Sequence, residues 1–194
     1  MKHPSNRELF DYWNERRGER LAPERADIEP SAIRHILGDT FVLEVSGIES
    51  HLFRIAGTRL CALFGRELKS ESFLKLWQRS GQTAIRELIA VVMDKKAGIV
   101  ASVTGATSDD TLAPVSLEML LLPLAYQSRS DARVMGAMAP MAAPYWLGAK
   151  AVGPLTLGMF RHIGVSADMT VPRFKAAAGR LKHGLTVYDG GRAC

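Results

Sequence analysis

Two charged residues stand inside apolar strand patterns and are the first candidates for chemistry. Arg54 lies in the run Leu52-Phe53-Arg54-Ile55, and Glu118 interrupts the apolar run Leu117–Tyr126. A charged side chain in such a strand needs solvent or a partner on its own face, because an unpaired buried charge costs several kcal/mol. We therefore expect Arg54 and Glu118 either to bind a polar group of a ligand or to pair with each other.

Motifs of catalysis and of metal binding do not occur in the sequence. There is no nucleophile elbow, no phosphate-binding loop, no paired Cys-x-x-Cys spacing and no His-Glu-x-x-His segment. A lone carboxylate such as Glu118 in a strand does not make an acid–base mechanism. We predict no catalytic residues and no metal site, and hence that the protein is not an enzyme; a small α+β enzyme acting on an apolar ligand is the remaining alternative.

Composition indicates one domain with a real core in a chain of 194 residues, 47% of them hydrophobic. The formal net charge is +5, but basic residues are mixed with acidic ones, so we predict no nucleic-acid partner. Cys61 and Cys194 make no disulfide framework, and no apolar run is long enough to span a membrane. We expect a cytoplasmic protein without a leader sequence.

Hydrophobic periodicity predicts the elements in chain order. Ser5–Arg20 is expected to form an amphipathic helix with Ser5 as its N-cap and Glu8 completing a capping box. A short helix at Ser31–Leu37 follows, and the longest helix is expected between Gln82 and Lys96. We also predict a short helical turn at Leu60–Phe64, a helix at Val171–Lys182 and a tail from Tyr188. The five predicted strands are Thr40–Val45, His51–Ala56, Ile99–Thr104, Val115–Tyr126 and Arg133–Ala139, and Leu155–Ile163 is a candidate sixth strand.

This order of elements predicts an α+β fold with an antiparallel sheet and helices on one face. The first two strands are close enough to form a hairpin, and the helices are inserted between the second and third strands. We divide the chain into an N-terminal helical extension (1–39), a core (40–140), and a C-terminal extension and tail (141–194).

Several segments resemble a bacterial family of stand-alone PAS-like proteins. They include Asp11-Tyr12-Trp13, Phe53-Arg54-Ile55-Ala56-Gly57-Thr58, Leu63-Phe64-Gly65-Arg66-Glu67-Leu68 and Glu118-Met119-Leu120-Leu121-Leu122-Pro123-Leu124, together with Arg20–Ile28, Tyr145-Trp146 and Val187–Gly191. The resemblance covers nearly the whole chain and implies a PAS-like fold with a ligand cavity between the inner sheet face and the helices after the second strand. Candidate ligand-binding residues are Arg54, Trp77, Glu118, Phe41, Phe53, Phe64 and Met119, with Leu43, Leu63 and Leu117 as further wall residues; each apolar one could instead simply fill the core.

PAS domains bind varied cofactors, but no specific motif here supports haem or flavin, and the cofactor is unknown. None of the five histidines (His3, His35, His51, His162 and His183) stands out as an axial ligand. Cys61 lies where light-sensing relatives carry a reactive cysteine, yet its flanking residues lack their polar motif. A small buried hydrophobic side chain is the better interpretation of Cys61.

The resemblance implies a sensor or adaptor in bacterial signal transduction that works through another protein. Tyr12 and Trp13, beside basic residues, are candidate interface anchors for a homodimer, or they cover the sheet within the same chain. Our first hypothesis is a signalling module that binds a small molecule, a partner protein, or both. The second is an interaction-only adaptor with a filled core.

Overall fold

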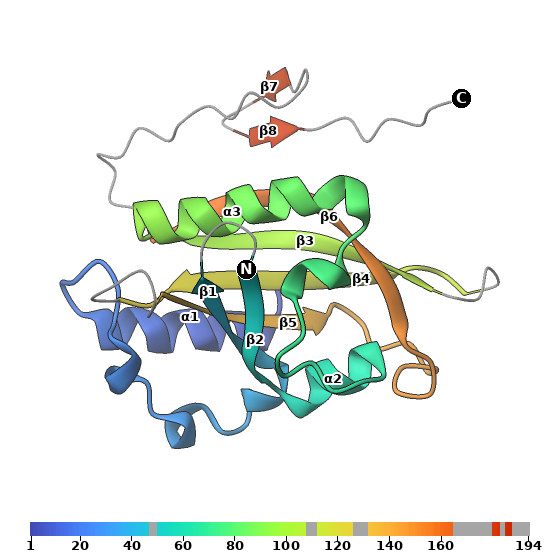
Figure 1. Ribbon diagram of the computed structural model, residues 1–194, viewed down its shortest axis with the longest axis horizontal. Helices are drawn as coiled ribbons and strands as arrows, with labels where there is room; N and C mark the ends of the chain where they lie inside the picture. Colours follow the sequence, from blue (N-terminus) through green and yellow to red (C-terminus); the bar gives the residue numbers. More distant parts are fainter. Residues whose placement is uncertain (47–49, 108–111, 126–131, 165–179, 183–184, 188–194) are drawn as a thin grey trace.

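A computed structural model describes residues 1–46, 50–107, 112–125, 132–164, 180–182 and 185–187. One antiparallel sheet of six strands forms its centre, in the order β2-β1-β5-β4-β3-β6 (Figure 1). The strand bounds are β1 Thr40–Ser46, β2 Ser50–Ala56, β3 Gly98–Thr107, β4 Val115–Pro123, β5 Arg133–Pro140 and β6 Val152–Ile163. The predicted α+β fold is therefore confirmed, with the candidate sixth strand present at the sheet edge.

Among the described residues, three α-helices pack around the sheet: α1 Pro4–Arg17, α2 Thr58–Phe64 and α3 Gln82–Lys95. Short 3₁₀ turns lie at Arg25–Asp27, Pro30–Ile33, Leu37–Asp39, Phe73–Leu76 and Arg79–Gly81. α2 ends at Gly65, whose left-handed backbone (φ 63°) favours glycine. In α3, the five apolar residues whose spacing predicted the helix are the five buried ones: Ile85, Leu88, Ile89, Val92 and Met93.

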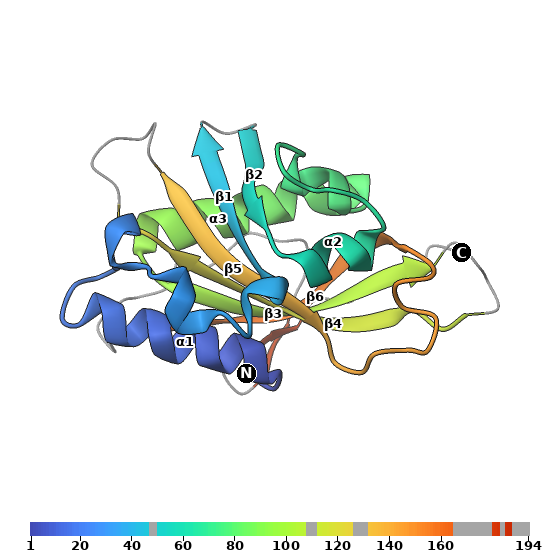
Figure 2. The ribbon, with the colours of Figure 1, turned by 90° about the horizontal axis from the view of Figure 1, so that it is seen from below.

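Helices pack on both faces of the sheet, and side chains that alternate along each strand point to the two faces in turn. The inner face carries Phe41, Leu43, Leu117 and Met119 and packs against α2 and α3. The outer face carries Val42, Leu120, Leu122, Met135 and Ala137 and packs against α1. Figures 1 and 2 show α3 and α1 on opposite sides of the sheet. The expected placement of the helices on one face thus holds for α2 and α3, while the N-terminal helix covers the other face.

Three predicted local features differ from the structure. α1 begins at Pro4 with His3 as its N-cap, because the His3 Nδ1 atom accepts from the backbone N–H of Ser5 at 3.2 Å. Ser5 and Glu8 therefore form no capping box, and the Glu8 carboxylate pairs with His35 instead. The stretch expected to be one helix at 31–37 forms two separate 3₁₀ turns, since Pro30 starts a short turn and Gly38 lies in the next.

The C-terminal region is described in part. β6 pairs with β3 along most of its length, so the main sheet continues into the stretch assigned to the C-terminal extension. The predicted helix at 171–182 lies mostly outside the described residues, and its last three residues form β7 (Arg180–Lys182), which pairs with β8 (Leu185–Val187). The predicted tail from Tyr188 lies outside the described residues.

Candidate functional site

The predicted wall residues of the ligand cavity all lie in one buried cluster on the inner face. This cluster contains Phe41, Leu43, Phe53, Leu63, Phe64, Trp77, Leu117 and Met119. They come from β1, β2, α2, β4 and the segment before α3, which are separated by up to 78 positions in the chain, from Phe41 to Met119. Sequence reasoning therefore identified side chains that share one environment. Whether they bind a ligand stays a prediction.

Four aromatic rings form the centre of this cluster. The ring centroid of Phe73 lies 5.5 Å from that of Phe41, 5.6 Å from that of Phe53 and 5.7 Å from that of Trp77. Phe41 and Phe53 also meet edge to face at 5.8 Å. Such pairs stabilise a fold by about 0.5–1.5 kcal/mol each beyond burial of their area. Phe73 was not among the predicted wall residues, because it stands in a short 3₁₀ turn without a helical or strand period.

The indole of Trp77 brings a polar group into this apolar cluster. The residue is 2% exposed, and its backbone forms a parallel bridge with Leu155 of β6. Its Nε1 atom is buried and has no hydrogen-bond partner within the described part of the chain. By contrast, the buried Nε1 of Trp13 donates to the carbonyl oxygen of Pro123 at 2.8 Å. A buried donor without an acceptor costs about 1–3 kcal/mol. The Nε1 atom of Trp77 is thus a buried donor of the inner cluster that lacks an acceptor among the described residues.

Arg54, Trp77 and Glu118 do not converge, so the three form no common site, and Arg54 and Glu118 do not pair with each other; whether any of them binds a ligand stays a prediction. Arg54 is exposed on the edge strand β2, whereas its neighbour Phe53 is buried in the inner cluster. β1 and β5 lie between β2 and β4, so the strands of Arg54 and Glu118 are about 14 Å apart at the usual strand spacing. Trp77 belongs to the inner face, whereas Glu118 points to the outer face.

Glu118 anchors the start of α1 to the sheet. Its carboxylate accepts from the backbone N–H groups of Lys2 at 2.8 Å and His3 at 2.9 Å, and from the side-chain amide of Asn6 at 3.1 Å. The residue is 7% exposed. Burial opposes its ionisation, but the hydrogen bonds from His3, Lys2 and Asn6 outweigh burial and lower the pKa of Glu118 below its usual value. These bonds explain how a carboxylate can stand in an otherwise apolar strand.

A second buried carboxylate, Asp39, ties α1 to α2 around the end of the sheet. Its two oxygens accept from Arg59 Nε at 2.7 Å and Nη2 at 2.8 Å, and Oδ2 also accepts from Ser5 Oγ at 2.7 Å. Although burial opposes ionisation, the bonds from Arg59 and Ser5 lower the pKa of Asp39. Arg59 Nη2 additionally donates to the carbonyl oxygen of His35 at 3.0 Å. The sequence pattern gave no sign of this network, because its members are loop and helix residues far apart in the chain.

The two candidate interface anchors are buried inside the chain. Tyr12 is 8% exposed and Trp13 is 0% exposed, and both pack on the outer face of the sheet. Their cationic neighbours cover them, with Arg16 lying 5.2 Å from the Tyr12 ring centroid and Arg17 lying 5.6 Å from that of Trp13. The structure therefore matches the second of the two interpretations, in which these rings cover the sheet of their own chain.

The residues considered for cofactor chemistry are dispersed. His35 pairs with Glu8 at the surface, His51 is buried in β2, and His162 of β6 is partly buried, which lowers its pKa. His183 lies outside the described residues. Burial raises the pKa of the Cys61 thiol, which packs against the inner cluster. The described residues include no group of three metal-ligating side chains, and no helix among them is long and apolar enough to cross a membrane.

A family model described as a PAS domain matches residues 1–139. The chain therefore belongs to the PAS domain family, a class of sensory and signalling domains, as the six-stranded antiparallel sheet with its covering helices also indicates. A search of curated proteins finds no match to the chain. The matched residues include α1 and end before β6, so α1 belongs to the family pattern even though it covers the outer face.

Proposed function

We propose that this protein is a PAS sensor of bacterial signalling that binds a small molecule in the inner cluster and passes the signal to a partner protein. The observation that carries the proposal is the buried Trp77 Nε1, which has no acceptor among the described residues. A ligand with a carbonyl, ether or ring-nitrogen acceptor would satisfy this donor. The surrounding rings of Phe41, Phe53 and Phe73 fit an apolar or aromatic ligand body.

The hydrogen bonds that connect α2 to α1 through Asp39 support a way for a conformational change at the ligand to reach the surface. Arg59 belongs to α2, which covers the inner face, and Asp39 connects it to Ser5 of α1 on the outer face. A ligand that displaces α2 would strain these bonds, and the change would reach the opposite face. The homodimer and the signalling partner expected from the family remain parts of this proposal.

An interaction-only adaptor with a filled core is the second candidate, and the close contacts among the four aromatic rings favour it. Neither candidate requires catalysis, and we propose that the protein is not an enzyme. In support, Glu118, the carboxylate considered for acid–base work, is already engaged by the N–H groups of Lys2, His3 and Asn6.

A thermal-shift screen against a metabolite library separates the two candidates. A ligand present at one hundred times its dissociation constant adds about 2.7 kcal/mol to the free energy of unfolding, which is about 5–10 °C in melting temperature for a chain of this size. Absorbance spectra of the purified protein, before and after reconstitution, test haem and flavin. If no compound raises the melting temperature and no cofactor is retained, the adaptor is favoured over the sensor.

Trp77→Phe tests whether the indole N–H contacts the ligand. It keeps an aromatic ring and removes the donor, so the affinity for a hit should fall about tenfold, while the unliganded protein loses the packing of the larger ring but no hydrogen bond within the described residues. Trp13→Phe is the matched control, because it removes an equally buried indole N–H from the opposite face. That variant should lose stability and keep the affinity. Equal affinity of the Trp77→Phe variant and the wild type would refute the assigned role.

A further inference from the structure

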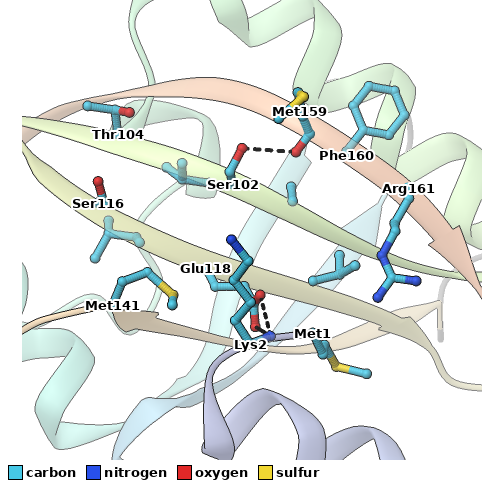
Figure 3. A pocket seen from close by; sticks show the side chains of 14 residues that line it. Met1, Lys2, Ser102, Thr104, Ser116, Glu118, Met141, Met159, Phe160 and Arg161 are labelled. Atoms are coloured by element: carbon cyan, nitrogen blue, oxygen red, sulfur yellow. Dashed lines mark hydrogen bonds between the residues drawn. The ribbon is translucent and has the colours of Figure 1, made fainter. Parts of the chain in front are cut away.

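The outer face has an open groove that α1 does not cover. It lies over β3, β4 and β6 beside the N-terminal segment and has a volume of about 440 Å³ (Figure 3). Its bed consists of short side chains, because Ser102, Thr104 and Ser116 occupy neighbouring outward positions where β3 and β4 pair. This groove lies on the opposite side of the sheet from the inner cluster, so it is independent of the proposed ligand site.

Two methionines form apolar rims of the groove. Met141 is 40% exposed and Met159 is 61% exposed, and both line the hollow from the edges of the short-chain bed. Large apolar side chains with this exposure, gathered at one hollow, mark a binding surface. Methionine suits such a surface because its unbranched thioether adapts to the shape of a partner.

The accessible charges at the groove are positive. Lys2 and Arg161 both line it, both are exposed, and neither side chain has an ion pair within the described residues. Glu118 is the one carboxylate among the lining residues, and it is 7% exposed with its oxygens engaged by N–H donors. The groove therefore combines an apolar hollow with two exposed cations.

We propose that this groove binds a segment of a partner protein in which an apolar side chain is flanked by carboxylates. The apolar side chain lies on the short-chain bed between Met141 and Met159, and the carboxylates pair with Lys2 and Arg161. Charge complementarity distinguishes this partner from a second copy of the chain. A two-fold pairing of this face would bring the same two cations toward each other, with only the occupied Glu118 to offset them.

The test selects ligands from a displayed library of random linear peptides on the immobilised full chain. Enriched peptides should carry Asp or Glu next to a large apolar residue. With ¹³C-methyl methionine labelling, a selected peptide should shift the methyl signals of Met141 and Met159. The buried methionines Met93, Met119, Met135 and Met138 are internal controls, and their signals should stay in place.

Two variants connect binding to the groove. Lys2→Gln combined with Arg161→Gln should weaken an acidic peptide about fivefold and reduce the salt dependence of its affinity. Ser116→Phe should abolish binding by filling the bed, and Thr83→Phe, on the exposed side of α3, should not change it. Unchanged signals of the buried methionines verify that each variant is folded.

Five outcomes overturn the proposal. Enrichment of basic peptides would contradict the proposed acidic partner segment. Enrichment of peptides that do not shift the methyl signals of Met141 and Met159 would contradict its binding between these residues. If the Ser116→Phe variant binds the peptide with unchanged affinity, the peptide does not bind in this groove. A concentration-dependent dimer in sedimentation that Ser116→Phe dissociates would assign the face to a second copy. Shifts of the two methyl signals by dodecanoate, without any by peptides, would assign it to a small amphiphile.

Discussion

Replacing Glu118 by Gln should detach the start of α1 from the sheet while leaving the fold intact. In the wild type, Oε2 accepts from the Lys2 N–H at 2.8 Å, and Oε1 accepts from His3 N–H at 2.9 Å and from Asn6 Nδ2 at 3.1 Å. A Gln amide keeps one oxygen acceptor and replaces the other by an NH₂ donor. That donor would face a backbone N–H, so at least one buried hydrogen bond is lost. The remaining hydrogen bonds are then made to a neutral amide oxygen instead of a charged carboxylate.

The expected loss follows from these contacts. Hydrogen bonds to a charged group contribute about 1.5–3 kcal/mol each, and a buried group left unsatisfied costs about 1–3 kcal/mol. Since the Gln oxygen retains part of the interaction, we expect a loss of about 2 kcal/mol in the free energy of unfolding. For a chain of this length that corresponds to about 4–8 °C in melting temperature.

Urea unfolding at neutral pH measures the loss, and hydrogen exchange locates it. Amides of α1 should exchange faster in the Glu118→Gln variant, whereas those of α3, on the other face, should not change. Glu44→Gln is the matched control, because Glu44 is also a strand carboxylate but makes only a half-exposed ion pair with Arg133 at 3.6 Å. Its loss should stay below about 0.5 kcal/mol.

The difference in the free energy of unfolding between the wild type and the Glu118→Gln variant should depend on pH. The sign of this dependence follows from the direction of the pKa shift. The folded pKa of Glu118 is lowered, so its stabilisation is complete above the unfolded pKa, near 4.3, and is lost as the pH falls through the folded pKa. The gap between the two proteins should therefore narrow below about pH 4. A loss no greater than that of Glu44→Gln, or a gap that widens on acidification, would refute the anchoring role.

Two other substitutions test the contact between Arg59 and Asp39 and the close approach of the backbone at Gly57. Arg59→Lys should cost about 1 kcal/mol in urea unfolding, because lysine cannot reproduce the bidentate contact with Asp39, and the exposed Arg66→Lys should cost nothing measurable. Gly57→Ala should cost about 1–3 kcal/mol, because a Cβ there would overlap two backbone carbonyl oxygens; Gly81→Ala, with open space around it, should be neutral. Equal losses within either pair would contradict the stated contacts.

Patterns with a short period predicted the strands and the main helix well. The five buried residues of α3 recur at helical spacing, and the hairpin of β1 with β2 follows from two alternating runs joined by turn residues. The aromatic wall residues were also grouped correctly, because strand alternation places Phe41 and Phe53 on one face. The cap of α1 was assigned wrongly, because Ser5 has the side chain of an N-cap, yet its hydroxyl donates to Asp39.

Partners across the fold could not be predicted from local patterns. Sheet order decides that Arg54 and Glu118 are separated by two strands, and no periodicity encodes sheet order. The bonds from Glu118 to Lys2, His3 and Asn6 join positions more than 110 residues apart. Arg54 therefore turned from a candidate ligand contact into an exposed edge residue, and Glu118 into an anchor of the N-terminal helix.

The amino-acid sequence by itself determined which residues are apolar and with what period, and hence the elements, the α+β class and the family. Only the tertiary structure decided which face each element covers. α1 packs on the outer face because Leu9, Tyr12 and Trp13 find an apolar surface there, after α2 and α3 have covered the inner one. That arrangement leaves the part of the outer face beside Lys2 and Arg161 uncovered, and it buries Trp77 where its N–H has no acceptor among the described residues.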